Sequence, residues 1–209
     1  MIEKSKVFSG IKMENENMNS EKTIKYDLEY IIQQYKRKSK LKYVFFWGDT
    51  ERGNEVTKAC LSQWYPSVFT ADGITYSTAE QYMMAQKAQL FQDKAIYKEI
   101  MTAKHPKQCK ALGQQVKNFS QTVWDAHKFQ IVVDGNMAKF SQNPKLKEFL
   151  LQTGDRVLAE ASPYDKIWGI GMTEDNEKVI NPLEWNGQNL LGFALMEVRR
   201  KLKGINDIK

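Results

Sequence analysis

Short runs of apolar and aromatic residues occur in four places along the chain, and each run predicts a strand. The two middle runs flank Asp72-Gly73, a dipeptide that tolerates positive φ, so we expect them to form a hairpin. The last run is interpreted as the alternating pattern of a strand. The four runs are 43–47, 68–70, 74–76 and 156–160.

Helical spacing of apolar residues dominates the rest of the sequence. Helix starts are expected at Ser77 or Thr78, Asp93, Pro106, Ser120 and Asn143, and a final amphipathic helix is expected over 190–202. The helices from Asp93 and Pro106 should end near Met101 and Lys117, and 134–136 should interrupt or bend the helix after Ser120. A few short strands, a helical majority and another strand indicate a single α+β, mostly helical domain, because strands and helices do not alternate.

The first 42 residues differ in composition from the rest and are predicted to be an N-terminal extension to a domain over 43–209. Residues 1–22 are polar and without period, which predicts disorder, and a short amphipathic helix follows from Tyr26. Residues 1–42 hold ten Lys and Arg against six Asp and Glu, which is four of the six net positive charges. The weak basic patch over 36–42 either touches phosphates or is a solvated helix end.

Composition and hydropathy favour a soluble, cytoplasmic protein. With 209 residues the chain can bury one full core, and it has no apolar run of eighteen residues and no apolar segment of a secretion signal near Met1. We therefore expect no membrane association. Cys60 and Cys109 lack CxxC spacing and a neighbouring histidine, so we expect ordinary buried thiols, no metal and no redox cofactor.

A carboxylate and an amine, Glu80 and Lys87, lie two helical turns apart in the predicted helix after Thr78. A spacing of seven residues returns almost to the same side of a helix, so both groups share one face. The pair suits acid and base chemistry, or an amine nucleophile kept dry. The alternative is a solvated charge pair on an exposed helix face.

A second dense segment combines Asp165 and Trp168 with Gly169 and Gly171. One turn can aim the acid and the indole at a common point, and the two glycines allow a ligand to approach the backbone. A tight surface loop anchored by a half-buried tryptophan is the alternative. Asn189 follows, and it either binds substrate with this group or caps the final helix.

Many short motifs occur together in one order over about 45–199. They are Leu61–Phe69, Asp72-Gly73 with Tyr76, Glu80–Met84 with Lys87-Ala88, Ala111–Gly113, Trp124, Lys139-Phe140 with Gln142-Asn143, Leu150–Gly154, Glu160–Pro163 with Asp165, Trp168–Gly171, and Asn189–Gly192 with Leu195-Met196 and Val198-Arg199. With this set of motifs the chain resembles the NADAR family, also called YbiA-like. Residues 1–42 lie outside the resemblance.

The resemblance implies an N-glycosidase that hydrolyses the bond between ribose C1 and a nitrogen. Implied substrates are small N-ribosides, namely phosphoribosylamino-pyrimidine intermediates of riboflavin synthesis, or ADP-ribose attached to guanine in nucleotides or nucleic acid. By matching motif, Glu80, Lys87 and Asp165 are the implied catalytic groups, and Trp124 and Trp168 line the site. Cleavage builds positive charge at C1, which a carboxylate stabilises while an acid protonates the leaving base. Glu80 and Asp165 can divide these tasks, or Lys87 can capture C1 as a Schiff base.

Two positions depart from the family pattern. Position 63 is Gln where Asn is usual, and position 114 is Gln where Arg is usual. Loss of an arginine removes a candidate phosphate contact. A module that binds ADP-ribose or a nucleotide without turning it over is therefore the first alternative to an enzyme. A structural protein that acts through its basic N-terminal helix is the second.

Overall fold

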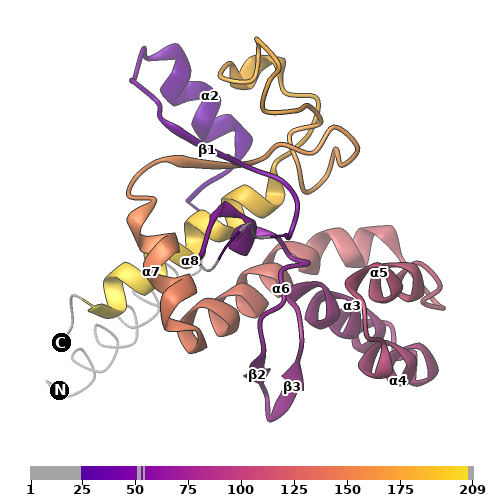
Figure 1. The fold of residues 1–209 in the computed structure, drawn as a ribbon. Helices are drawn as coiled ribbons and strands as arrows, with labels where there is room; N and C mark the ends of the chain where they lie inside the picture. Colours follow the sequence, from indigo (N-terminus) through magenta and orange to yellow (C-terminus); the bar gives the residue numbers. More distant parts are fainter. Residues whose placement is uncertain (1–24, 51–52, 54, 207–209) are drawn as a thin grey trace, which may run out of the picture.

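A computed structural model describes residues 25–50, 53 and 55–206 of the chain (Figure 1). The expected disorder of residues 1–22 lies outside the described residues. In the part of the chain that is described, no helix is long and apolar enough to cross a membrane.

Two strands far apart in the sequence form a parallel pair. Strand β1 (Tyr43–Phe46) aligns with β4 (Val157–Glu160), in a register that ends with Phe46 beside Glu160. Parallel strands place their carboxyl ends at the same edge, so the segments after Phe46 and after Glu160 leave the sheet side by side. The sequence predicted both strands, but nothing in it predicted that they pair.

The hairpin is confirmed. Strands β2 (Phe69–Ala71) and β3 (Ile74–Tyr76) are antiparallel, and the turn residues Asp72 and Gly73 both have positive φ. In Figure 1 this hairpin projects from the helical body. The Phe69 and Tyr76 rings pack against Tyr82, which fixes the hairpin to the helix that follows it.

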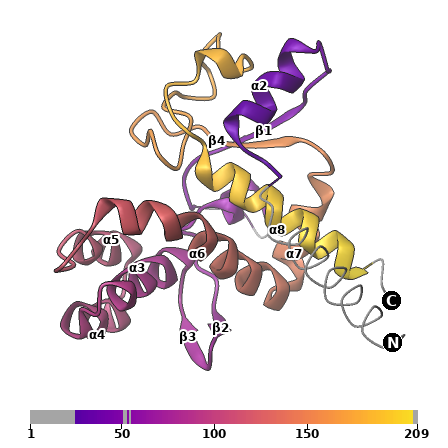
Figure 2. The same ribbon diagram turned by 180° about the vertical axis from the view of Figure 1, so that it is seen from behind.

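Helices make up most of the domain (Figure 2). They are α2 (Leu28–Lys36), α3 (Ala79–Leu90), α4 (Lys94–Thr102), α5 (Pro106–Gly113), α6 (Gln121–Gln142), α7 (Pro144–Gln152) and α8 (Leu190–Asn206), with short 3-10 turns η1 (Lys58–Leu61) and η2 (Pro182–Glu184). Helix α3 packs on α4, α5 and α6, while α8 packs on α6 and β4. The α+β, mostly helical fold class is confirmed.

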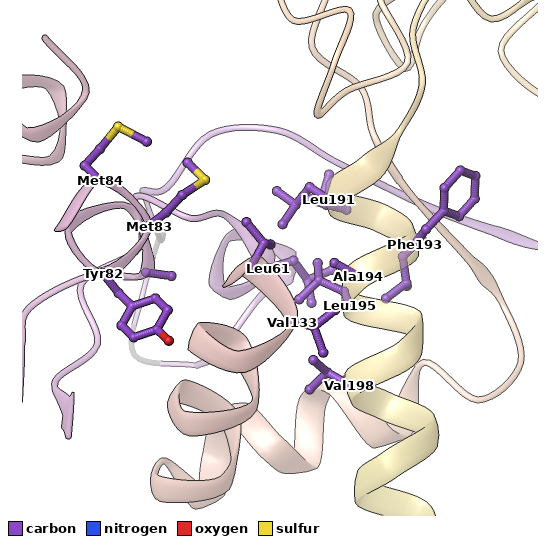
Figure 3. Close-up of a cluster of buried hydrophobic side chains, with 14 of the residues drawn as sticks. Leu61, Tyr82, Met83, Met84, Val133, Leu191, Phe193, Ala194, Leu195 and Val198 are labelled. Atoms are coloured by element: carbon purple, nitrogen blue, oxygen red, sulfur yellow. The ribbon is translucent and has the colours of Figure 1, made fainter. Parts of the chain in front are cut away.

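A continuous apolar core joins α3, α6 and α8 (Figure 3). Met83 of α3, Val133 of α6 and Leu195 of α8 are each at most 4% exposed. Leu61 of η1 is fully buried in the same core. The side of α3 that carries Met83 is therefore part of the packed core of the domain.

The predicted interruption of the helix after Ser120 is wrong, because α6 is one continuous helix through Gly135, while the alternative of a bend stays a prediction. A side chain is absent there for a packing reason: a Cβ on Gly135 would lie 2.4 Å from a ring carbon of Tyr82. The glycine is therefore a close contact between α6 and α3. Separately, α5 ends at Gly113, earlier than the predicted Lys117.

Gly135→Ala is expected to lower stability, because the added methyl group forces the Tyr82 ring or the α6 backbone to move. Overpacking of this kind costs about 1–3 kcal/mol. Gly204→Ala is the matched control, since Gly204 also lies in a helix and a Cβ there meets nothing within 4 Å. Urea unfolding should show a loss for the first variant and none for the second; equal midpoints would contradict the packing role of Gly135.

The segment before β1 packs onto the domain. Helix α2 buries Ile31 in the common core, and the backbone N–H groups of Lys25 and Tyr26 donate to the Glu197 carboxylate on α8. The basic cluster over 36–42 is mostly exposed. Its binding to phosphates and the domain boundary at residue 42 stay predictions.

Candidate active site

A cavity of about 550 Å³ opens where the carboxyl ends of β1 and β4 meet α3, α5 and the start of α6. In open α/β sheets ligands bind beyond the carboxyl ends of the parallel strands, and this cavity lies at the same end of the β1–β4 pair. The residues that line the cavity are Trp47, Gly48, Asp49, Ser62, Gln63, Trp64, Glu80, Met83, Met84, Lys87, Lys110, Gly113, Gln114, Trp124, Glu160, Ser162, Tyr164, Asp165, Trp168 and Leu191.

The start of α3 is fixed by capping bonds. Thr78 is the N-cap, and its hydroxyl accepts from the Gln81 N–H at 3.1 Å. The Gln81 carboxamide oxygen accepts in return from the Ser77 N–H at 2.8 Å. The Glu80 N–H donates to the Gln63 carbonyl at 2.9 Å, so the first turn of α3 is tied to the segment after η1. These bonds hold Glu80 at the cavity wall.

Glu80 is a buried acid. Its side chain is almost fully buried, and among the described residues its Oε1 has no hydrogen-bond partner. Burial raises the pKa of Glu80 to about 7, and the charge of Asp165 adds to the rise, while Lys110 and a hydrogen bond from Trp64 oppose it. Near neutral pH this carboxyl group can both accept and donate a proton.

Lys87 lies at the other end of α3 and also lines the cavity. Its Nζ donates to the Gly113 carbonyl at 2.8 Å and sits over the rings of Phe119 and Trp124, 4.4 and 5.6 Å from their centroids. Burial lowers the pKa of Lys87. A larger neutral fraction of the amine makes it a better nucleophile.

The surface charge pair proposed as an alternative for Glu80 and Lys87 is not what the structure contains. Within the described residues no ion pair joins them, Glu80 is 3% exposed, and both face one cavity. The helix spacing of seven residues predicted the shared face. The burial of Glu80 depends on the segment after η1, which the spacing does not contain.

A second acid, Glu160, lines the same cavity and was not predicted as a site residue. It ends β4, its Oε2 is buried, and among the described residues this oxygen has no hydrogen-bond partner. Burial raises the pKa of Glu160 to about 8, with further increases from Asp165 and Glu80 and an opposing effect of Lys110. A polar residue at the end of a predicted strand, just before the Asp165 loop, was the available signal.

Asp165 lines the cavity, and one oxygen of its carboxylate is engaged by the backbone. Its Oδ1 accepts from the N–H groups of Ile167 and Trp168 at 2.9 and 2.7 Å, which shapes the loop. Its Oδ2 faces the Lys110 Nζ at 3.9 Å. The charge of Lys110 thus acts on Glu80, Glu160 and Asp165, and nothing in its helical spacing distinguished it from an ordinary exposed lysine.

Trp124 and Trp168 also line the cavity, and their contact with a substrate stays a prediction. Trp124 is only 9% exposed and forms part of the wall beside Lys87. Trp168 is half-buried at the end of the Asp165 turn. Two indole rings therefore belong to the wall of the cavity.

The structure places Gly169, Gly171 and Asn189 outside the cavity wall. A Cβ on Gly169 would lie 2.9 Å from the carbonyl oxygen of Glu160, and one on Gly171 would lie 3.0 Å from Asn186. The glycines therefore allow backbone segments to approach one another, not a ligand.

Asn189 is fully buried and connects α8 to β4. Its Oδ1 accepts from the Glu160 N–H at 3.0 Å, and its Nδ2 donates to the Leu158 carbonyl at 2.9 Å. These bonds satisfy the edge of β4 that β1 does not pair. Asn189 therefore positions Glu160, which neither the predicted cap nor the predicted substrate contact anticipated.

The two departures from the family pattern both lie at the cavity. The Gln63 carboxamide oxygen accepts from Asn136 at 2.7 Å, so its longer side chain is held inside the wall. The segment that carries Gln63 is also held by the buried Lys139, whose Nζ donates to the Cys60 and Ser62 carbonyls at 2.7 and 2.8 Å. Gln114 is exposed at the end of α5.

No group of three or more His, Cys, Asp or Glu that could hold a metal ion occurs in the part of the chain that the structure describes. Cys60 and Cys109 are buried free thiols, as predicted.

Comparison with known proteins agrees with this architecture. A family model described as the NADAR domain matches residues 45–203. The chain belongs to the NADAR family. The N-glycosidase R617 of Acanthamoeba polyphaga mimivirus is 47% identical over 165 residues, which cover 77% of this chain and 96% of that protein. The chloroplastic riboflavin biosynthesis protein PYRR of Zea mays is 34% identical over 140 residues, which are 64% of this chain and 21% of that protein.

The fold of the NADAR domain is also seen in a solved structure. The NMR structure of the Escherichia coli protein YbiA superposes with a TM-score of 0.65 and 26% sequence identity, and covers 80% of this chain and 88% of that one. The family that the order of motifs along the sequence predicted is confirmed.

Proposed function

We propose that the cavity hydrolyses the bond between C1 of a phosphorylated ribose and an amino-substituted heterocycle. The observation that carries the proposal is that Glu80 and Glu160 line one cavity, and that each has a buried carboxyl oxygen without a hydrogen-bond partner among the described residues. Names of relatives support the reaction class: the mimivirus protein and a Nostoc punctiforme protein are named N-glycosidases. These relatives confirm the prediction of a hydrolase that acts on N-glycosyl bonds.

The two acids suit different tasks. A departing heterocycle needs a proton, and Glu160, whose pKa is about 8, carries one at neutral pH. Positive charge that develops at C1 needs an anion, and Glu80, whose pKa is about 7, is about half ionised there. We assign Glu160 as the acid and Glu80 as the carboxylate beside C1, with Asp165 adding negative charge to the same wall.

Lys87 offers a covalent route that stays open beside direct hydrolysis. In this route the amino-ribose opens, the Lys87 amine adds to C1, the heterocycle leaves with a proton, and water hydrolyses the resulting Schiff base. Trp124 and Phe119 shield the amine, and burial lowers its pKa.

Borohydride added during turnover is expected to trap a sugar on Lys87, because it reduces a Schiff base to a stable amine. Mass spectrometry of the digested protein should find the added mass on the peptide that contains Lys87. Lys87→Arg is the control, since a guanidinium does not form the adduct. Wild-type protein that turns over substrate without any trapped adduct would exclude the covalent route and leave direct hydrolysis.

The substrate is tested by offering two compounds to the protein. One is ADP-ribosylated guanosine and the other is a phosphoribosylamino-pyrimidine, and chromatography follows the release of the free heterocycle. We expect release from at least one of them. Binding without release from either would favour the alternative, a module that holds ADP-ribose or a nucleotide without cleaving it.

A further inference from the structure

The mouth of the cavity carries two exposed aromatic rings that the proposed reaction does not use. Trp47 is 54% exposed and Tyr164 is 86% exposed, and both belong to the cavity lining. Their ring centroids are 6.1 Å apart and the planes are tilted by 53°. Single exposed apolar residues are ordinary on protein surfaces, but an adjacent aromatic pair at the edge of a cavity marks a binding surface.

The fold holds these rings together. Trp47 directly follows Phe46 at the end of β1, and Tyr164 follows Glu160 by four residues after the end of β4. Phe46 and Glu160 are opposite each other in the parallel register, and the Ala161 N–H extends the ladder by donating to the Phe46 carbonyl at 2.8 Å. The strand ends that position Glu160 therefore also position the ring pair.

Solvent exposure distinguishes Trp47 and Tyr164 from the inner aromatic residues of the cavity. Trp124 is 9% exposed and lies with Lys87, so it belongs to the interior where the riboside is cleaved. Trp47 and Tyr164 have their surfaces open to solvent, with the half-exposed Lys110 in the same lining. A ligand that extends outward from the interior thus meets one cation and two aromatic faces.

We propose that Trp47 and Tyr164 form an outer subsite that stacks a second nucleobase, joined through phosphate to the riboside that is cleaved inside. The proposal rests on the proposed function and adds a preference for substrates with two bases. The second base comes either from the adenosine of an ADP-ribosyl group or from a neighbouring nucleotide of a strand. Stacking on aromatic residues tolerates any base, because every base has a π face.

Calorimetry with three ligands tests the subsite without requiring turnover. ADP-ribose carries the adenine, ribose 5-phosphate lacks any base, and a short single-stranded DNA supplies bases without ADP-ribose. Trp47→Ala and Tyr164→Ala are expected to weaken ADP-ribose binding about tenfold or more, and to leave the affinity for ribose 5-phosphate within about twofold. Tyr164→Phe should retain wild-type affinity, because the ring remains.

Leu183→Ala is the matched control, since Leu183 is a 51% exposed apolar residue outside the cavity lining. It should bind all ligands as the wild type does. A loss confined to ADP-ribose identifies the adenine as the stacked base, and a loss that includes the DNA identifies a neighbouring base of a strand. Unchanged affinity for both ADP-ribose and DNA in the two alanine variants overturns the subsite.

Kinetics separate failure of the subsite from failure of the proposed function. With a phosphoribosylamino-pyrimidine, which has no second base, both alanine variants should keep the wild-type KM and kcat. With ADP-ribosylated guanosine their KM should rise about tenfold while kcat changes little. An equal rise of KM for both substrates contradicts the subsite, whereas a wild type that cleaves neither substrate contradicts the proposed function and leaves the calorimetric result to decide the subsite.

Discussion

Glu80→Gln is expected to lower kcat for C1–N cleavage by about 10²- to 10⁴-fold, because the amide cannot carry the negative charge that stabilises positive charge at C1. The substitution preserves shape and volume, so the bond between the position 80 N–H and the Gln63 carbonyl should persist. Initial rates of heterocycle release, measured at pH 7.5 with saturating substrate, give the ratio. Wild-type rates in the variant would remove Glu80 from the reaction.

Stability measurements distinguish such a loss of activity from misfolding. The folded protein holds the pKa of Glu80 at about 7, above the ordinary 4.5. The free energy of unfolding therefore falls as pH rises between these values, and above pH 7 the folded protein bears the full cost of a buried, ionised Glu80. Gln does not ionise and avoids that cost. Glu80→Gln should therefore unfold at a higher temperature than the wild type at pH 8, with a gain of up to about 3 kcal/mol.

Glu160→Gln is expected to lower kcat about 10²-fold or more and to remove the fall in activity at high pH. The wild type should show a narrow bell-shaped profile: activity declines below about pH 7 as Glu80 gains a proton, and above about pH 8 as Glu160 loses one. Because the two carboxyl groups interact, the two apparent pKa values of the profile describe the Glu80–Glu160 pair and not the individual residues. The variant lacks the acid that titrates on the upper limb.

Glu99→Gln is the control for this variant, since Glu99 is an exposed acid on α4 outside the cavity lining. Its rate and its pH profile should match the wild type. If Glu160→Gln still loses activity above about pH 8, another group, such as Lys87, causes this fall. The acid assigned to Glu160 would then be wrong.

Local features of the sequence predicted the elements well. Capping residues such as Thr78 and Asp93, the Asp72-Gly73 turn and the apolar runs act over a few residues, so the pattern contains the forces that form each element. One exception was Gly135, whose low helix propensity is outweighed by the packing of Tyr82 against α6. That contact joins two helices that are far apart in the sequence.

The site could be predicted only in part for the same reason. The spacing of Glu80 and Lys87 gave a shared helix face, whereas the surroundings of Glu80 come from the segment after η1, from α5 and from the Asp165 loop. Glu160 reaches the cavity because β4 pairs with β1, and Asn189 holds it there. Long-range strand pairing leaves no local mark in a single sequence, so Glu160 and the inward role of Asn189 were missed.

The most direct test of the account identifies the products of wild-type protein by mass spectrometry, with Glu80→Gln as the parallel reaction. The substrates are ADP-ribosylated guanosine and a phosphoribosylamino-pyrimidine. If Glu80 stabilises positive charge at C1, the products are the free heterocycle with its amino group intact and the released ADP-ribose or ribose phosphate, formed at least about 10²-fold more slowly by Glu80→Gln. Cleavage at a phosphate bond, or equal C1–N cleavage by both proteins, would contradict the proposed mechanism.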